Sequence, residues 1–310
     1  MDYAVRLGRR ALGTTAENPP VGCVIVKNER LLGVGWTQPG GRPHAETEAL
    51  AMAGETARGA TAYVTLEPCA HDGRTPPCAE ALVLAGVARV VSAVEDPDPR
   101  VSGRGHAILR TAGISVETGA SAARDLAGFF TRIIRKRPYV IMKLAFSADK
   151  KIASAHGQRT AITGPESQAR VHLLRAQCDA ILVGIGTALI DNPSLTCRLP
   201  GMEQRSPKPY VLSRNRDVPN FTVLRGSIPE ALQALPANRL LVEGGGMIAS
   251  AFLEAGLVDE IQLFQSPNTL GTQGVDGPTL HLESFSLFEQ ELLGADRLSV
   301  YHSVLPWEKV

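Results

Sequence analysis

Short apolar runs and amphipathic stretches alternate through the first 137 residues. Apolar runs of about 4 to 8 residues between turn residues are typical of strands, whereas apolar residues three and four apart predict helices. This alternation predicts a three-layer α/β domain. The expected strands cover residues 21–27, 31–36, 62–66, 88–94 and 114–117, and the expected helices cover residues 1–13, 45–53, 77–85, 106–111 and 122–134.

The second half of the chain shows the same alternation and predicts a second α/β domain. A capping box is expected at its first helix, with Thr163 as the cap, Pro165 in the first helical position and Glu166 three residues after Thr163. The expected strands cover residues 139–147, 180–186, 209–213, 239–245, 260–266 and 298–305, and the expected helices cover residues 165–176 and 246–256.

A basic run, Arg135-Lys136-Arg137, precedes Pro138 and marks the expected domain boundary. Proline ends the preceding helix, and a strand follows it. We therefore expect domains at residues 1–137 and 138–310, in line with the roughly 100–200 residues of an ordinary domain. The basic run itself is interpreted as a solvated helix end.

Composition narrows the class of function. The formal net charge is +1, without the clustered basic face that a nucleic-acid partner requires, so we expect a small-molecule substrate. No apolar run approaches the roughly 18 residues of a membrane span, and residues 1–13 lack a signal-peptide core, which favours a cytoplasmic location. Five cysteines without an export signal argue for metal-bound or catalytic thiols over a disulfide framework.

Four residues of the first domain form the pattern of a hydrolytic zinc site. His44 and Glu46 follow Pro43, and Cys69 and Cys78 each follow a proline. If Pro43 opens a helix, His44 and Glu46 share its first turn, and the positive ends of helix dipoles favour thiolates. One histidine and two cysteines would hold zinc and leave the fourth position to water, while Glu46 would move protons.

Other interpretations of these cysteines compete with this one. The pair could form a disulfide or be two ordinary buried thiols, or the zinc could be purely structural, with His71 as the fourth ligand. Zinc nucleobase deaminases carry H-x-E followed by P-C-x-x-C. This chain has H-A-E and P-C, but eight residues separate its cysteines. Cys23, Cys178 and Cys197 lack such neighbours and are expected to be core residues.

The segments ENPPVGCVIV, HAETEAL, AYVTLEPCAHDGRTPPCAEAL and VEDPDPRVSGRG resemble the bifunctional riboflavin-biosynthesis deaminase–reductase family. The eight-residue gap is that family's form of the motif, so the resemblance implies zinc ligands and no disulfide. It implies a cytidine-deaminase-like N-terminal domain that releases ammonia from a diaminopyrimidinone carrying a ribose phosphate. It also implies substrate contacts at Asn18, His71 and Arg74, of which the arginine suits a phosphate.

The second half resembles the reductase half of the same family through GIGTALIDNPSLTCR, Gly184 to Arg198. The resemblance implies a dihydrofolate-reductase-like fold that uses NADPH to reduce the ribosyl side chain to ribityl. The glycines of VEGGGMIASAFL alone would be a weak phosphate-binding signal. Implied NADPH contacts are Ala145, Thr187, Asp191, Ser213, Gly245, Gly246, Met247, Ile248 and Ala249, and implied substrate contacts are Arg175, Leu195, Arg198 and Glu243.

The second half also departs from the family. Lys150 stands where the family has glycine, Arg159 and Ala161 stand where it has serine and tryptophan, and the segment 213–242 is short. The departures leave open a deaminase with a degenerate reductase domain. A separate alternative is a zinc RNA or nucleoside deaminase with an accessory binding domain, against which the neutral net charge counts. A homodimer or larger homo-oligomer is compatible with the sequence.

Overall fold

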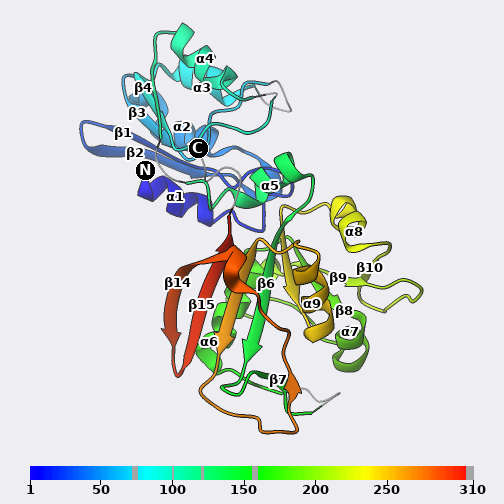
Figure 1. Ribbon diagram of the computed structural model, residues 1–310. Coiled ribbons are helices and arrows are strands. Elements are labelled where there is room, and N and C mark those ends of the chain that lie inside the picture. Colours follow the sequence, from blue (N-terminus) through cyan, green and yellow to red (C-terminus); the bar gives the residue numbers. More distant parts are fainter. Residues whose placement is uncertain (72–75, 100, 120–121, 156–159, 305–310) are drawn as a thin grey trace. The chain divides into compact units, whose positions relative to one another are not determined.

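The chain divides into two compact units, Met1–Lys136 and Arg137–Val310, each described here by itself (Figure 1). The expected boundary after residue 137 lies one residue from this division. The computed structural model describes residues 1–71, 76–99, 101–119, 122–155 and 160–304. None of the helices in these ranges combines the length and hydropathy that crossing a bilayer would need.

Unit 1 is a five-stranded sheet between helices, in the order β2-β1-β3-β4-β5. β1 is antiparallel to β2 and β3, whereas β3, β4 and β5 are parallel. Its strands are β1 (Gly22–Lys27), β2 (Arg30–Trp36), β3 (Thr61–Val64), β4 (Arg89–Ser92) and β5 (Ser115–Thr118), and its helices are α1 (Asp2–Arg9), α2 (Ala45–Ala53), α3 (Cys78–Ala85), α4 (Arg104–Thr111) and α5 (Ala127–Arg135).

Two helices cover opposite faces of this sheet. Ala4 and Leu7 of α1 pack with Val24 of β1. On the other face α2 lies directly on the backbone of β2, because a Cβ at Gly33 would come within 2.1 Å of the Ala49 carbonyl oxygen. A Cβ at Gly35 would come within 2.2 Å of the Ala45 carbonyl oxygen at the start of α2. The three layers expected from the sequence are confirmed, and the start of α2 is fixed against the sheet.

Unit 2 contains an eight-stranded sheet in the order β10-β9-β8-β11-β6-β12-β15-β14. The first six of these strands are parallel, and β15 and β14 join them in antiparallel pairing. The strands are β6 (Tyr139–Phe146), β7 (Lys151–Ala153), β8 (Ala180–Gly184), β9 (Lys208–Leu212), β10 (Thr222–Leu224), β11 (Arg239–Glu243), β12 (Glu260–Gln265), β13 (Val275–Asp276), β14 (Phe285–Leu293) and β15 (Asp296–Ser303).

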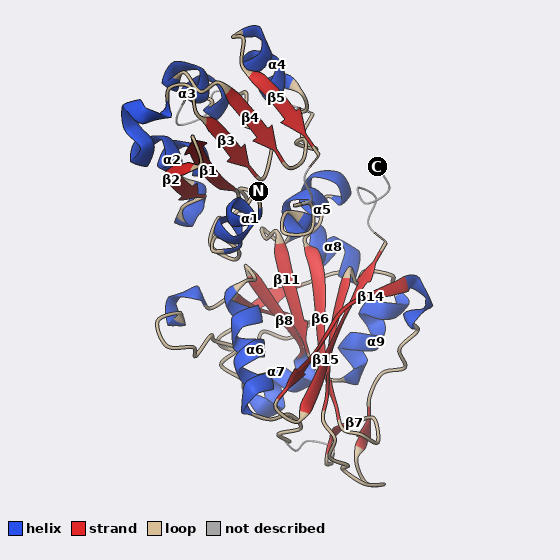
Figure 2. Cartoon of the chain, turned by 90° about the vertical axis from the view of Figure 1, so that its left-hand side faces the viewer, coloured by secondary structure: helices blue, strands red, loops and turns tan. Residues whose placement is uncertain are grey.

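Helices cover both faces of the larger sheet (Figure 2). Ala249 and Phe252 of one helix pack with Val140 and Val242, and Val171 of another packs with Phe264 on the opposite face. The carboxyl ends of the parallel strands therefore share one edge between two helical layers, where α/β sheets usually bind ligands. The helices are α6 (Pro165–Ala176), α7 (Ile185–Asp191), α8 (Ile228–Ala234) and α9 (Gly246–Glu254).

Several expected helix boundaries need correction. The cap of α6 is Gly164, and its backbone N–H donates to Asp296 Oδ2 at 2.7 Å, so a distant carboxylate accepts the cap N–H, as Glu166 was expected to do in the capping box. A capping box is present at α8 instead, between Ser227 and Glu230. The expected helix over residues 122–134 begins only at Ala127, after a run of turns over residues 123–126.

The basic run before Pro138 is only partly a solvated helix end. Arg137 is 8% exposed, and its guanidinium forms two hydrogen bonds with the Asp259 carboxylate, at 2.5 and 2.9 Å. Asp259 also accepts the backbone N–H of Val140 at 2.9 Å. The buried ion pair thus ties the first strand of unit 2 to the segment that precedes β12, and its charges are paired as burial requires.

The sequence patterns missed some strands and overextended others. β8 ends at Gly184 because that residue caps α7, although a strand was expected as far as residue 186. β14 was not expected, since its run FSLFEQELL lacks clear alternation, yet it pairs along β15. The short strands β7, β10 and β13 and the helices α7 and α8 were also not expected.

Candidate active sites of the two units

The three expected zinc ligands of unit 1 lie together. His44 caps α2, Cys78 is the first residue of α3, and Cys69 lies in the loop after β3. His44 Nδ1 lies 3.3 Å from Cys78 Sγ and 3.7 Å from Cys69 Sγ. Among the described residues the group of potential ligands contains these three side chains, whose donor atoms all lie within 4.8 Å of one another.

This donor set fits zinc. Zinc–sulfur and zinc–nitrogen bonds of about 2.3 and 2.0–2.1 Å in tetrahedral geometry separate the donors by about 3.6 Å. The two nitrogen–sulfur distances, 3.3 and 3.7 Å, bracket that value. His71 lies outside the group, so a structural site with His71 as fourth ligand is not favoured, and a fourth position stays available. All five cysteines are free thiols, so the disulfide alternative is wrong.

The two thiols have opposite electrostatic characters. The backbone N–H of Cys78 donates to Cys69 Sγ at 3.2 Å. The Cys78 side chain is also hydrogen-bonded to this sulfur, and together with His44 it lowers the pKa of the Cys69 thiol to about 4. The pKa of Cys78 is raised, because its thiol donates to Cys69 and is buried. Of the two thiols, Cys69 is therefore the one whose surroundings favour the thiolate.

Glu46 lies in the first turn of α2 and is 4% exposed. Burial raises the pKa of its carboxyl to about 7, and the nearby Cys69 thiolate contributes to that shift. A carboxyl that titrates near neutrality can both accept and release a proton. One detail differs from expectation: α2 begins at Ala45, so His44 is its cap and Pro43 precedes the cap.

Glu67, which the sequence analysis did not single out, supports the Cys69 loop. Its side chain is fully buried and accepts three backbone N–H groups, from Asp96 at 3.2 Å, Gly103 at 2.9 Å and His106 at 3.1 Å. Two of these donors belong to the start of α4. A charged residue directly after an apolar strand and two positions before Cys69 is the sequence signal that could have revealed it.

The expected pyrimidine contacts of unit 1 are only partly described. Asn18 is half-buried, donates through Nδ2 to the Thr15 carbonyl oxygen at 3.4 Å and lies against Gly41. His71 is exposed in the loop between the two cysteines. Arg74 lies outside the described residues. The roles of these three residues stay predictions.

In unit 2 two expected substrate residues form an ion pair. The Arg175 guanidinium, on α6, donates to both carboxylate oxygens of Glu243, at the end of β11, at 2.8 Å each. A third Arg175 donor contacts the Thr196 carbonyl oxygen at 3.1 Å. This pair lowers the pKa of Glu243 despite its burial. Lys143 is the register partner of Glu243 on β6, and burial lowers the pKa of its ammonium.

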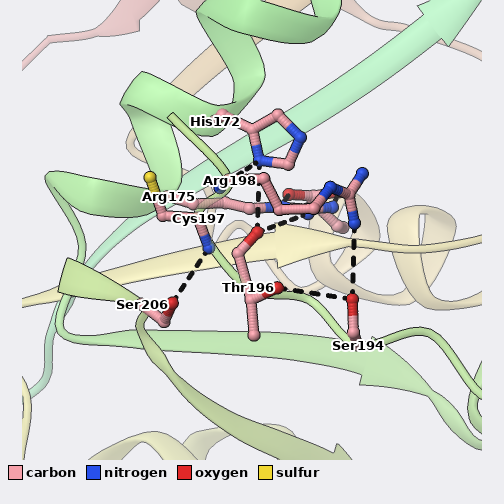
Figure 3. A network of polar contacts seen from close by, with 8 residues as sticks. His172, Arg175, Ser194, Thr196, Cys197, Arg198 and Ser206 are labelled. Carbon is pink, nitrogen blue, oxygen red and sulfur yellow. Dashed lines mark hydrogen bonds and ion pairs between the residues drawn. The ribbon is translucent and has the colours of Figure 1, made fainter. Parts of the chain in front are cut away.

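The loop after α7 presents the remaining substrate candidates (Figure 3). Leu195 is 5% exposed and has a φ of +52°, which turns the chain sharply. Arg198 is exposed, and its guanidinium contacts Ser194 Oγ at 3.4 Å. The Cys197 N–H donates to Ser206 Oγ at 3.0 Å, which anchors the far side of the loop. Arg198 is thus held at the surface with its charge available to an anion.

The expected NADPH residues lie around the carboxyl ends of the parallel strands. Gly245 caps α9, and a Cβ there would lie 3.9 Å from Thr187 Oγ1 of α7. Ala249 is buried and Met247 is 84% exposed, so these two side chains differ in what they could contact. Ser213 follows β9, is buried and accepts the backbone N–H of Arg216 at 3.1 Å. Asp191 is exposed at the end of α7, and Ala145 is half-buried on β6.

The structure describes some of the positions at which the chain departs from the family pattern. Lys150 is exposed with a φ of +60°, the left-handed region that glycine adopts without strain. Ala161 is exposed before α6, and Arg159 lies outside the described residues. The short segment 213–242 still forms β10 and α8 and reaches β11.

Comparisons with known proteins cover nearly the whole chain. Residues 1–94 match the family described as the cytidine and deoxycytidylate deaminase zinc-binding region, and residues 138–287 match the RibD C-terminal domain. The riboflavin biosynthesis protein RibD of Escherichia coli is 40% identical over 88% of each chain, and that of Corynebacterium ammoniagenes is 42% identical over 86% of this chain and 85% of the relative.

Solved structures extend this likeness to the fold. Acinetobacter baumannii RibD superposes with a TM-score of 0.90 at 36% identity and covers 98% of both chains. A Thermotoga maritima diaminohydroxyphosphoribosylaminopyrimidine deaminase/5-amino-6-(5-phosphoribosylamino)uracil reductase gives a TM-score of 0.88 at 32% identity, over 98% of this chain and 97% of that one.

Proposed function

The chain belongs to the RibD family of riboflavin biosynthesis proteins, and on that premise we propose which residues carry out its two reactions. It is an enzyme with a zinc-dependent deaminase unit and an NADPH-dependent reductase unit. We propose that unit 1 deaminates 2,5-diamino-6-ribosylamino-pyrimidinone 5′-phosphate and that unit 2 reduces the ribosyl group to ribityl. The cluster of His44, Cys69 and Cys78 beside Glu46 is the observation that carries the proposal.

In the deaminase, His44, Cys69 and Cys78 hold the zinc ion. When bound there, zinc supplies Lewis-acid activation of water. Glu46 accepts a proton from the attacking water and returns it to the departing amino group, so that water enters and ammonia leaves. Its burial, with 4% exposure, supports this role because the carboxyl lies beside His44, Cys69 and Cys78 and is shielded from bulk water. Asn18, His71 and Arg74 bind the pyrimidine and its phosphate.

In the reductase, the turn Gly245 to Ala249 presents backbone N–H groups of α9 to the cofactor phosphates. Ala145, Thr187, Asp191 and Ser213 complete the cofactor contacts. When bound, NADPH supplies the hydride that reduces the sugar. Arg198 binds the substrate phosphate, Leu195 shapes the pocket, and the Arg175–Glu243 pair orients the sugar through its remaining hydrogen-bonding capacity.

The proposal also includes the setting of the enzyme. We propose a cytoplasmic location, because all five cysteines are free thiols, as a reducing compartment favours. The substrate is a small phosphorylated pyrimidine, and the net charge of +1 does not favour a nucleic-acid partner. A homo-oligomer is compatible with both reactions.

A coupled assay tests both reactions at once. Zinc-loaded protein is mixed with the diaminopyrimidinone ribosyl phosphate and NADPH, and ammonia release and NADPH absorbance are followed together. The proposal predicts both signals, and predicts that the deaminated compound supplied alone still consumes NADPH. Ammonia without NADPH oxidation would show a deaminase with a degenerate second unit. Absence of ammonia release from the zinc-loaded protein would overturn the assignment of unit 1.

A further inference from the structure

His172 lies on α6 one turn before Arg175 and faces the segment Ser194–Arg198, called the 194–198 loop below (Figure 3). Its Nδ1 atom lies 3.1 Å from the Thr196 carbonyl oxygen. The same atom lies 3.3 Å from the backbone nitrogen of Arg198, whose N–H points toward it. Arg175 contacts the same Thr196 carbonyl at 3.1 Å. The imidazole therefore holds the peptide that leads directly to the expected phosphate-binding arginine.

The two contacts of Nδ1 exclude each other. With a proton, Nδ1 donates to the Thr196 carbonyl; without one, its lone pair accepts the Arg198 N–H. A protonated imidazole has a proton on both nitrogens and makes only the first contact. The neutral ring can make either contact, depending on its tautomer, whereas the protonated ring can only donate to the Thr196 carbonyl oxygen. Uptake of a proton by His172 therefore commits the ring to the contact with Thr196, two residues before Arg198.

The charges around His172 link this choice to an anion. Arg175 on α6, Arg198 in the loop and Glu243 on β11 are the charged groups whose electrostatic effect reaches the ring. Burial lowers the pKa of His172, and Arg175 and Arg198 lower it further, while Thr196 and Glu243 oppose the shift. A phosphate bound by Arg198 would offset the positive charge of that arginine and favour the protonated ring.

We propose that His172 is a positioning residue for the phosphorylated substrate of the reductase: it holds the 194–198 loop and takes up one proton when a phosphate binds at Arg198. The inference deepens the proposed reductase function and rests on it for the identity of the substrate. It follows that lowering the pH strengthens substrate binding by this reductase more than it strengthens binding by a variant with a non-titrating side chain at position 172.

Two variants separate positioning from a general structural role. His172→Leu removes both contacts, and the KM for the deaminated substrate should rise roughly tenfold with kcat nearly unchanged, since a lost hydrogen bond costs about 1–1.5 kcal/mol. His172→Asn keeps a donor or acceptor near the Nδ1 position, and its KM at pH 8 should stay within about threefold of the original enzyme. Ammonia release by unit 1 serves as the folding control and should be unchanged in both variants.

The pH profile is the decisive readout. The ratio of the KM of the original enzyme to that of His172→Asn should fall as the pH drops from 8 to 6, because only the original enzyme gains a proton on binding. The substrate phosphate titrates near pH 6 in both proteins and cancels in the ratio. A constant ratio, or a loss of kcat without a change in KM for His172→Leu, would overturn the proposal.

A binding measurement distinguishes this inference from the reductase assignment. The imidazole pKa of His172 is followed by NMR in the full chain, with and without ribose 5-phosphate as the probe. A rise in pKa with the probe supports the inference even if the chain fails to oxidise NADPH, an outcome that would overturn only the proposed function. The probe is used at a concentration that saturates the original enzyme but does not saturate Arg198→Ala. An unchanged pKa of His172 in the original enzyme at this concentration would overturn the inference.

Discussion

The backbone N–H of Cys78 donates to the sulfur of Cys69 at 3.2 Å, so one expected zinc ligand is stabilised by the peptide of another. Replacing Cys69 by Ser should therefore remove the thiolate that this N–H stabilises and abolish both zinc binding and ammonia release. NADPH oxidation with the deaminated compound should be retained. Zinc per chain is measured by mass spectrometry, with Cys23→Ala, a buried thiol of β1, as the control that keeps its zinc.

Replacing Glu46 by Gln should separate chemistry from metal binding. The amide keeps the size of the side chain but cannot accept the proton of water, so ammonia release should fall by about a hundredfold or more. Zinc content should stay at one per chain, because Glu46 is not among the three grouped ligands. Loss of zinc together with activity would instead show that the ligand set is wrong.

Glu67 offers a test of how the Cys69 loop is supported. Glu67→Ala would leave the buried N–H groups of Asp96 and His106 and the partly buried N–H of Gly103 without their acceptor and should lower the free energy of unfolding of unit 1 by about 3 kcal/mol or more. In calorimetry, the unfolding transition of unit 1 is the one whose midpoint temperature is raised by zinc.

Glu67→Gln, which keeps an acceptor oxygen, should recover part of this loss. Glu117→Ala removes a surface ion pair with Arg89 and should change the transition little. Equal effects of the alanine variants at positions 67 and 117 would contradict the supporting role of Glu67.

Asp96 predicts a pH dependence of stability. Burial, with the nearby Asp98 and Glu67 carboxylates, raises the pKa of Asp96 to about 7 from an ordinary 3.8. The stability associated with the neutral carboxyl is therefore present at low pH and is lost as the pH rises through about 7. Asp96→Asn should stabilise unit 1, by on the order of 2 kcal/mol more at pH 8 than at pH 5.

The matched control for Asp96 is Glu95→Gln. It removes the same charge from the exposed neighbouring position and should show no such pH dependence. Unfolding midpoints in denaturant at the two pH values provide the comparison. A gain that is the same at both values would mean that Asp96 is ionised throughout this range.

Lys150 predicts a stabilising substitution in unit 2. Its φ of +60° is strained for a residue with a side chain, so Lys150→Gly should raise the stability of this unit by about 1 kcal/mol. Lys150→Ala keeps a Cβ and should give no such gain. The transition to follow in calorimetry is the one that zinc does not shift. If alanine stabilised as much as glycine, backbone strain would not be the cause.

The zinc cluster was largely predictable because its evidence is local. His44 and Glu46 stand next to a helix start, and each cysteine follows a proline, so the chemistry of each residue could be recognised before the fold was known. The site of unit 2 was harder to predict. Arg175 and Glu243 are 68 positions apart and meet only because α6 lies on the face of the sheet to which β11 contributes.

The missed features depend on similarly distant partners. The cap of α6 is satisfied by Asp296, from β15, so the nearby Thr163 gave a misleading signal. Arg137 looks like part of a solvated basic run, but its partner Asp259 lies 122 positions away and draws it into the interior. Periodicity and local motifs contain no information about such pairs, which arise when the sheet assembles.

The packing of α2 on β2 has a consequence for how this family can diverge. At Gly33 and Gly35 the helix rests on main-chain atoms, 2.1 and 2.2 Å from where a first side-chain carbon would stand. A main-chain surface is the same whichever side chains surround it. The apolar residues of unit 1 could therefore drift through many substitutions over evolutionary time while His44 and Glu46 keep their places, provided that neither glycine acquires a single methyl group.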